Sequence, residues 1–375
     1  MKNIILTALA IGLLGACSPA VNSPITFDSN AINSVFGHWI TEPDGTVMLD
    51  PQPSGLVSWR GKLVTLSDRS AIESQRLRLR TIEPASAALL DEGMQMELST
   101  PVAQGCFGAY LADNPDLESL VVDPDDDNVF YMITEDASYA DAMPVNCQQK
   151  YQDTGSSPYP NLLVRLQLNA ENKAIMTHVR PLQFGHELAV GDSPNDGIEA
   201  LAFGPERVLY LGLERDSQKQ ARVFSLHMAA DFWQSEEFAA VTDAQLKLPK
   251  FDTGNHPING MDYYATADGN GYLIASARND SKLWIIDLKG KKETRILSME
   301  FYAQLTNTTD NCQDYEKMAN ASIEGVAVID QTVWMVNDPW KEVYPRNIIC
   351  LQNKSNYENY SPLLFSLAIQ ASWFD

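Results

Sequence analysis

The sequence predicts an all-β protein, a five-bladed β-propeller whose ring is closed by a strand from the N-terminal end of the domain. One short pattern occurs five times: a polar or acidic residue opens an apolar strand, a turn follows, and a second strand ends in an acidic group. Consecutive copies begin 64, 81, 60 and 65 residues apart, and a roughly constant period in an all-β chain is typical of a radial array of blades. The copies run from Ser54 to Asp68, Glu118 to Asp136, Glu199 to Asp216, Asn259 to Asp280 and Glu324 to Asp338.

The start of the chain has the features of an export signal. Lys2 precedes an uncharged stretch from Ile4 to Leu14, and small residues then lead to Cys17. This resembles a bacterial lipobox, so we expect residues 1–16 to be a lipoprotein signal peptide, with Cys17 the lipidated first residue of the mature chain. Residues 17–34 would form a tether and 35–375 the propeller. Because Ser18 follows without an acidic neighbour, we expect an outer-membrane lipoprotein of the cell envelope; the alternative is an ordinary signal peptide with an unrelated cysteine.

The net charge of −22 at pH 7 limits the possible partners. Nucleic-acid phosphates and anionic lipid head groups would be repelled, so contact with the membrane is expected through the lipid anchor alone. Cations are compatible partners.

Each hairpin is followed by a third strand, and most repeats have a more polar fourth one. The third strands are predicted at 74–82, 161–168, 221–228, 282–289 and 362–369, and the fourth at 93–99, 174–182, 243–249 and 294–301. The last repeat lacks its fourth strand, and the stretch from Val35 to Asp50 can supply it and close the ring. A sixth blade is the alternative, if 301–321 or the N-terminus contains a degenerate repeat.

Four cysteines remain after Cys17, and their placement repeats around two equivalent strands. Cys106 lies 12 residues before Glu118 and Cys147 lies 29 after it, while Cys312 and Cys350 lie 12 before and 26 after Glu324. Of the three possible pairings this favours Cys106–Cys147 and Cys312–Cys350, each tying a blade to a long insert. A metal site built from all four is the alternative, although no CxxC or Cys/His spacing is present.

The residues that open the five copies form a candidate metal site. In a propeller the first strand of each blade lines the central channel, so equivalent residues form a ring. Three carboxylates without a counter-charge would repel one another, and a set of oxygen ligands suits Ca²⁺ better than Zn²⁺. The alternative is a ring of polar residues that holds water. The ring consists of Ser54, Glu118, Glu199, Asn259 and Glu324.

A second set of candidates lies at the ends of the second strands. Arg69, Arg215 and Arg278 recur there in a chain with few basic residues, and arginine binds phosphate bidentately. Alternatively, each arginine pairs with the aspartate beside it and orders the loop. His186 and His256 precede two of the inner strands and are weaker candidates for acid or base chemistry.

The stretch SGLVSWRGKLVTLSDRS, from Ser54 to Ser70, resembles the opening blade of the calcium-activated nucleotidases, or apyrases. The Glu-Gly-Val and Glu-Ala-Leu phrases are also similar to phytase-like and esterase-like propellers. The first resemblance implies a channel calcium ion held by Ser54, Glu118, Glu199 and Glu324, with Asn259 where that family has serine.

These observations favour a calcium-dependent hydrolase of phosphate esters or anhydrides. The three arginines would hold a small phosphorylated substrate, and Asp68 or Glu214 would act as base. The alternatives are a non-catalytic binding lipoprotein and a lactonase or esterase.

Overall fold

The computed structural model describes residues 32–135, 144–150, 160–188, 190, 196–306, 312 and 314–375. Signal peptide, Cys17 and most of the predicted tether therefore lie outside the described residues. Within the described part of the chain, no helix is long and apolar enough to cross a membrane.

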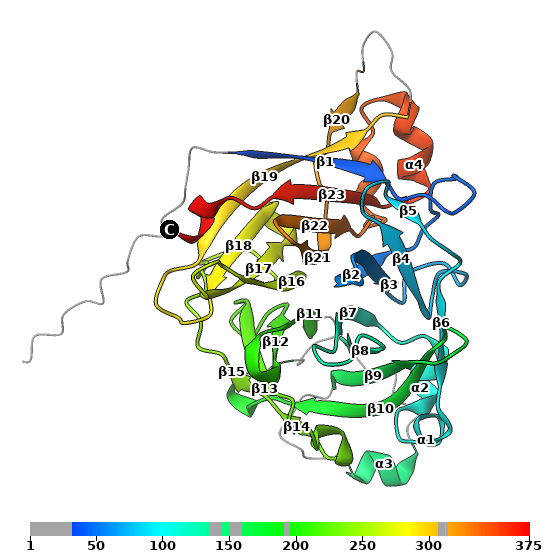
Figure 1. The fold of residues 1–375 in the computed structure, drawn as a ribbon, viewed down its shortest axis with the longest axis vertical. Helices are drawn as coiled ribbons and strands as arrows, with labels where there is room; N and C mark the ends of the chain where they lie inside the picture. The colour runs from blue at the N-terminus through cyan, green and yellow to red at the C-terminus, as the bar shows by residue number, and fades with distance from the viewer. Residues whose placement is uncertain are drawn as a thin grey trace, which may run out of the picture.

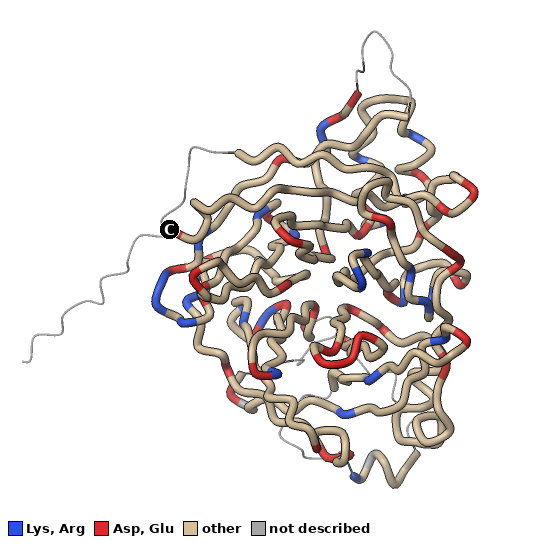
Figure 2. Tube along the Cα trace, in the orientation of Figure 1, with Lys and Arg blue, Asp and Glu red and all other residues tan. Residues whose placement is uncertain are grey.

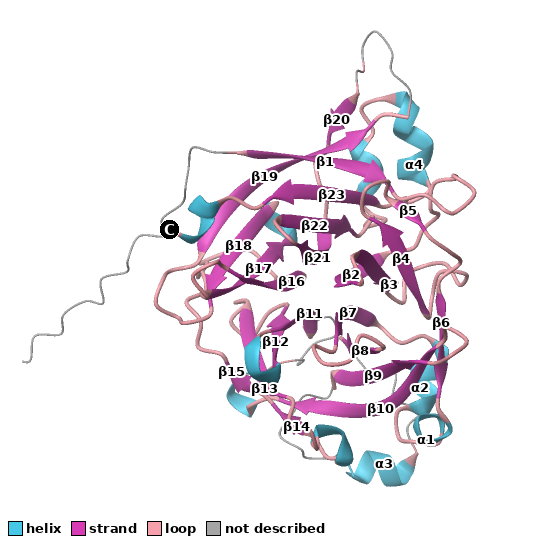
Figure 3. Cartoon of the chain, in the orientation of Figure 1, coloured by secondary structure: helices cyan, strands magenta, loops and turns pink. Residues whose placement is uncertain are grey.

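The strands form five blades arranged around a centre, and the short helices lie at the periphery (Figures 1 and 3). This confirms the predicted fold. Blade 1 contains β2 (Pro53–Trp59), β3 (Lys62–Ser67), β4 (Arg78–Glu83), β5 (Ala88–Leu89) and β6 (Met94–Leu98). Blade 2 contains β7 (Leu117–Val122), β8 (Val129–Thr134), β9 (Leu162–Leu168) and β10 (Ala174–Gln183). Blade 3 contains β11 (Ile198–Phe203), β12 (Val208–Leu213), β13 (Arg222–His227) and β15 (Thr242–Asp243). Blade 4 contains β16 (Gly260–Ala265), β17 (Gly271–Ala277), β18 (Lys282–Asp287) and β19 (Arg295–Gln304). Blade 5 contains β21 (Ile323–Ile329), β22 (Thr332–Asn337), β23 (Leu363–Ala368) and β1 (Asn33–Trp39).

Further short elements lie between or outside the blades. They are β14 (Ala239–Ala240), β20 (Tyr315–Lys317), α1 (Thr100–Ala103), α2 (Gly108–Asp113), α3 (Val145–Lys150) and α4 (Lys354–Glu358). Short 3-10 turns occupy 186–188, 205–207, 232–234, 278–280, 344–347, 351–353 and 371–374.

The ring has five blades because five inner strands form a closed circuit. β2 contacts β7, β7 contacts β11, β11 contacts β16, β16 contacts β21, and β21 returns to β2. In the 301–321 region, where a degenerate sixth blade was the alternative, the described residues contain only the end of β19 and β20, which pairs with it.

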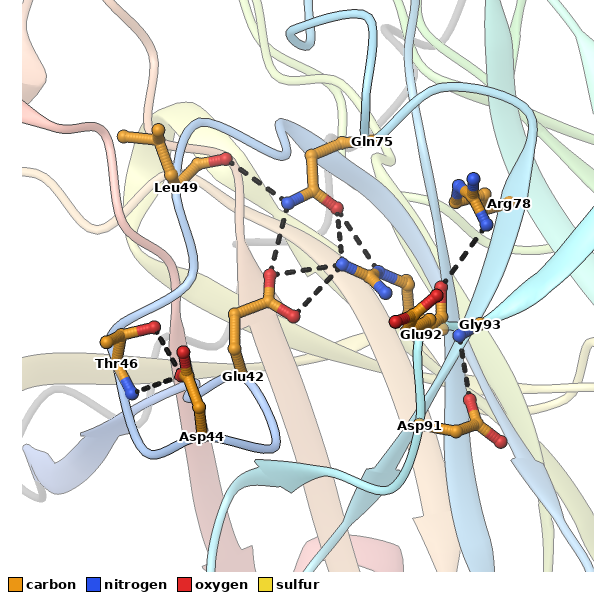
Figure 4. Close-up of polar contacts among 10 residues, drawn as sticks. Glu42, Asp44, Thr46, Leu49, Gln75, Arg78, Asp91, Glu92 and Gly93 are labelled. Atoms are coloured by element: carbon orange, nitrogen blue, oxygen red, sulfur yellow. Dashed lines mark hydrogen bonds and ion pairs between the residues drawn. The ribbon is translucent and has the colours of Figure 1, made fainter.

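The N-terminal strand closes the ring as predicted. β1 pairs antiparallel with β23 and so supplies the outer strand of blade 5, and it also pairs in parallel with β19 of blade 4. A polar cluster then fastens the loop after β1 to blade 1 (Figure 4). The buried Arg80 guanidinium donates to both carboxylate oxygens of Glu42 at 3.0 and 3.1 Å and to Gln75 Oε1. Gln75 in turn donates to Glu42, so the closing loop and β4 share one hydrogen-bonded unit.

Five apolar clusters fill the five interfaces between neighbouring blades. In β8, Val129, Tyr131 and Ile133 pack toward blade 3, whereas Phe130 and Met132 pack toward blade 1. Successive side chains of a strand point to opposite faces, so a strand between two neighbouring blades must be apolar on both. This is the physical reason for the continuous apolar runs in the second strands.

The fourth strand of blade 3 differs from the prediction. A strand was expected over 243–249, but only Thr242 and Asp243 pair with β13. The backbone beyond them is directed toward blade 4, where the Lys247 carbonyl accepts hydrogen bonds from Thr294 N–H at 3.2 Å and from its hydroxyl at 2.7 Å. The alternating apolar residues of 243–249 therefore belong to a half-buried segment, most of which does not pair with a strand.

Both predicted disulfides are present, Cys106–Cys147 and Cys312–Cys350. With all four sulfurs in disulfides, the alternative of a four-cysteine metal site is wrong. Each bridge joins the segment before an inner strand to the insert between the second and third strands of the same blade, β8 to β9 and β22 to β23.

Candidate functional site

The five residues predicted to form a ring lie at the same end of the five inner strands. Ser54, Glu118, Glu199 and Glu324 each occupy the extra position of a β-bulge in the pairing with the second strand. Asn259 directly precedes β16 and bonds to Ser276 through its backbone N–H. Bulges redirect a side chain and are common beside active sites. All five residues are at most 7% exposed, so they line a buried end of the channel, which we call the mouth.

A small residue follows every ring position and permits the inner strands to approach one another: Gly55, Ser119, Ala200, Gly260 and Gly325. At Gly260 a Cβ atom would lie only 2.2 Å from the carbonyl oxygen of Glu324 in the next blade. The close approach brings the ring side chains of neighbouring blades into contact.

Side chains at the mouth connect the blades in sequence. Ser54 donates to the Leu117 carbonyl of blade 2. Asn259 Nδ2 donates to Glu199 Oε2 at 3.1 Å, linking blades 4 and 3, and Arg278 pairs with Glu324, linking blades 4 and 5. Gln52 reaches the Pro339 carbonyl and joins blade 1 to blade 5.

Carboxylates gather on the side of the mouth formed by blades 2 and 3. Asp116, Glu118 and Glu135 each place one oxygen within 4.8 Å of the other two, and Glu135, Glu199 and Glu214 do the same. All five residues are buried. Oxygens at this mutual separation match a shell around one calcium ion, whose Ca–O distances are about 2.4 Å. The two groups share Glu135.

The environment raises the pKa of these acids. Burial, followed by repulsion from neighbouring carboxylates, raises the pKa of Glu118 and Glu135 well above the usual range, and burial with Glu214 nearby raises that of Glu199 to about 7. Burial also raises the pKa of Glu214, and burial with Asp68 nearby raises that of Asp338 to about 8. For Asp68 burial is again the main cause, and its pKa is raised to about 6. The carboxylates at the mouth thus outnumber the arginines that contact them.

The three arginines do not occupy one equivalent position. At the position directly after the second strand, blade 4 has Arg278, whereas the other four blades have an acid: Asp68, Glu135, Glu214 and Asp338. Arg69 and Arg215 come one residue after that position. Arg69 pairs with Asp116 at 3.1 Å and Arg215 with Asp196, while Arg278 contacts the ring itself. These partners are carboxylates distant in sequence, so the interpretation that each arginine pairs with the aspartate beside it does not describe this mouth.

The two histidine candidates have different outcomes. His256 Nδ1 lies 2.8 Å from Asp280, its Nε2 lies 2.9 Å from the Thr253 carbonyl, and its ring stacks on Phe251. Both nitrogens are therefore engaged with acceptors, which suits a structural role. The side chain of His186 lies outside the described residues.

Sequence reasoning missed Asp116 as a member of the site and assigned no role to Glu135 or Asp338. A signal existed for two of them, because Glu135 and Asp338 end the second strands in the same register as Asp68. Asp116 lies two residues before the ring residue of blade 2. The same position is Gln52 in blade 1 and Ser322 in blade 5, so the repeats show no recurring acid there.

Comparisons with known proteins give structural likeness only. No family model matches the chain, and no curated protein matches it in sequence. The chain is similar to a putative exo-β-1,3-galactanase from Bifidobacterium bifidum s17, with 12% identity, a TM-score of 0.47 and coverage of 90% of this chain and 94% of the other. It is also similar to the allergen Mala s 1 of Malassezia sympodialis, with 10% identity, a TM-score of 0.40 and coverage of 85% and 94%. An exo-β-1,3-galactanase from Clostridium thermocellum gives 10% identity, a TM-score of 0.43 and coverage of 88% and 61%. We draw no functional conclusion from likeness at this level, and the similarity to nucleotidases remains a resemblance of one motif.

Proposed function

We propose that the chain is an exported lipoprotein whose propeller binds calcium at the mouth and hydrolyses phosphate esters or anhydrides. One observation carries the proposal: a buried ring of five oxygen-bearing residues, four of them on equivalent β-bulges, in a mouth where Glu118, Glu135, Glu199 and Glu214 form no ion pair with a basic side chain in the described structure. Burying several carboxylates without a cation is unfavourable, and a bound divalent ion removes that cost.

The donor set fits a hard cation. Ser54, Glu118, Glu199, Asn259 and Glu324 offer only oxygen ligands, as Ca²⁺ prefers. The Asn259 side chain is fully buried, and its Oδ1 has no hydrogen-bond partner among the described residues, although its Nδ2 holds Glu199. An amide oxygen in that state is free to act as a metal ligand.

Calcium, when bound, would offset the charge on a phosphoryl oxygen. Arg278 is the best placed of the three arginines to contact that group, because its Nε is buried at the mouth without a partner in the described structure. Arg69 and Arg215 are held by Asp116 and Asp196. Asp68 or Glu214 would take a proton from the water that attacks phosphorus, and raised pKa values make both carboxylates stronger bases than usual. The P–O bond to the alcohol or phosphate leaving group would break as the new bond forms, and the leaving oxygen would take up a proton from the resulting carboxylic acid or from solvent.

The test is turnover of ATP, ADP, phytate and an aryl phosphate by the purified full-length chain, with calcium and after its removal. We expect calcium-dependent phosphate release, which Glu199→Gln abolishes together with the calcium-dependent rise in melting temperature. Glu73→Gln, at an exposed residue outside the ring, is the control and should behave as wild type.

Two outcomes would replace this function. A calcium-induced thermal shift without turnover of any phosphorylated substrate would favour the non-catalytic binding lipoprotein. Turnover of a lactone or aryl ester that Glu324→Gln abolishes would favour the esterase alternative. Turnover of β-1,3-galactan independent of calcium would contradict the proposal altogether.

A further inference from the structure

Between blades 2 and 3, the mouth contains two acids that are not members of the ring, and they lie beside one that is. Glu135 and Glu214 end the second strands β8 and β12, and each approaches Glu199 of the ring, with one oxygen from each of the three residues within 4.8 Å of the others. In the described structure, none of the three forms an ion pair with a lysine or arginine within 4.0 Å. Asp116, the neighbouring acid, differs because Arg69 pairs with it.

Two asparagines flank this group in the same manner. Asn255 Nδ2 donates to Glu214 Oε1 at 3.0 Å, and Asn259 Nδ2 donates to Glu199 Oε2 at 3.1 Å. In both residues Oδ1 is buried and has no hydrogen-bond partner among the described residues. Asn259 is entirely buried and Asn255 is half-buried. An orphaned buried acceptor costs free energy, so two such acceptors beside three carboxylates point to an absent donor or cation.

The charge balance supports a cation. Eight carboxyl groups surround the mouth, and only Asp116 and Glu324 of these have an arginine partner among the described residues. One divalent ion in the ring would still leave several carboxylates uncompensated. The eight are Asp68, Asp116, Glu118, Glu135, Glu199, Glu214, Glu324 and Asp338.

We propose that the propeller holds a second calcium ion, off the ring axis between blades 2 and 3, with Glu135, Glu214 and the Asn255 amide oxygen as ligands and Glu199 shared with the ring ion. This rests on the ring site of the proposed function for its shared ligand, but not on hydrolytic activity. A pair of ions held in this way would supply two positive charges with which to stabilise the attacking and leaving oxygens of a phosphoryl transfer.

The second ion changes the assignment of roles at the mouth. Glu214 would be a metal ligand and no longer available as a base, which leaves Asp68 on the opposite side of the mouth for proton transfer. Arg278 would keep its role of contacting the phosphoryl group, and the second ion would supply further positive charge there.

The experiment counts calcium ions bound to the full-length chain, by equilibrium dialysis followed by elemental analysis. We expect two ions for wild type and for Glu73→Gln, and one ion each for Glu214→Gln and Glu324→Gln. Asn255→Ala, which removes one neutral ligand, should weaken only one of the two binding steps by about tenfold or more and serves if Glu214→Gln does not fold.

Other numbers of bound calcium ions would show which of the two sites is absent. A single ion in wild type that Glu214→Gln retains and Glu324→Gln loses would overturn the second site while leaving the proposed function intact. A single ion lost in Glu214→Gln but kept in Glu324→Gln would overturn the ring site and with it the two-ion proposal. If wild type binds two ions, terbium and europium loaded together should show energy transfer between the lanthanides; its absence would contradict a shared ligand.

Discussion

The two ends of the inner strands carry acids in opposite electrostatic states. At the mouth, Glu118 lies near the start of β7 among other carboxylates, and burial with that repulsion raises its pKa. Asp123 lies at the hairpin end of the same strand, about 17 Å away. Its carboxylate oxygens accept hydrogen bonds from the Arg207 guanidinium at 2.8 and 3.1 Å and one from the Tyr131 hydroxyl. Although burial acts to raise it, these hydrogen bonds hold the pKa of Asp123 below its usual value.

The difference shows that this chain supplies arginine where an acid has a structural role. The acidic β7–β8 turn, red in Figure 2, is tied to blade 3 by Arg207 and to blade 1 by Arg60, which forms two hydrogen bonds of 2.7 Å with Asp127. At the mouth, Glu118, Glu135, Glu199 and Glu214 form no such pair in the described structure. The proposed partner of these acids is a cation from solution, and the contrast can be tested at either end.

The largest effect is expected at the hairpin end. Asp123→Ala removes a carboxylate that is 7% exposed and leaves Arg207 without its main partner, so we expect a loss of about 3 kcal/mol in the free energy of unfolding. Urea denaturation measures this loss, which should be equal with and without calcium. A loss confined to the calcium-loaded protein would mean that the two ends are coupled and that the contrast drawn here is wrong.

The pH dependence of the metal-free protein comes next in size. The pKa of Glu199 is about 7 in the folded state against 4.5 for an unperturbed glutamate, so the folded state binds this proton more tightly than the unfolded state. The resulting stabilisation is complete below pH 4.5 and is lost as the pH rises through 7. We expect a decline on the order of 2–3 kcal/mol between pH 5 and pH 8.

Denaturation at several pH values in calcium-free buffer measures this decline. Glu199→Gln should make the decline smaller without removing it, because other acids of the mouth also have raised pKa values. Saturating calcium should reduce the decline in wild type, because the metal would replace the proton. A decline equally steep in Glu199→Gln would assign the pH dependence to other groups.

The comparison also separates what a sequence can predict from what it cannot. The five blades, the closing strand and both disulfides could be predicted, because they depend on residue periodicity and on spacings that recur from one repeat to the next. The ring residues follow for the same reason, since one position recurs in each copy. Asp116, and the different positions of Arg69 and Arg278, depend on contacts between blades, and a pattern read within one blade does not contain them.

A smaller effect of opposite sign is expected at the mouth. Glu118→Gln keeps the shape of a side chain that forms no hydrogen bond with the other described residues, but it removes one of several mutually repelling charges. In calcium-free buffer at pH 8 we therefore expect the variant to be more stable than wild type by about 1–2 kcal/mol. With calcium the order should reverse, because a ligand is missing. The pair of melting curves checks both signs, and destabilisation under both conditions would show that Glu118 is structural.

The smallest effect is expected at the exposed pair of the hairpin end. Arg60→Ala removes the two bonds to Asp127 and the contact of the guanidinium with Trp59 at 4.5 Å, yet both charged side chains are about half exposed to solvent. Water screens such a pair and holding two long side chains costs entropy, so the melting temperature should fall much less than for Asp123→Ala. Calcium binding should be unchanged, as isothermal titration can measure. If Arg60→Ala weakened calcium binding as strongly as Glu118→Gln, charge at the hairpin end would act on the mouth at long range. The mouth would then be tuned by the whole charge distribution of the ring, and the local explanation of its raised pKa values would have to be abandoned.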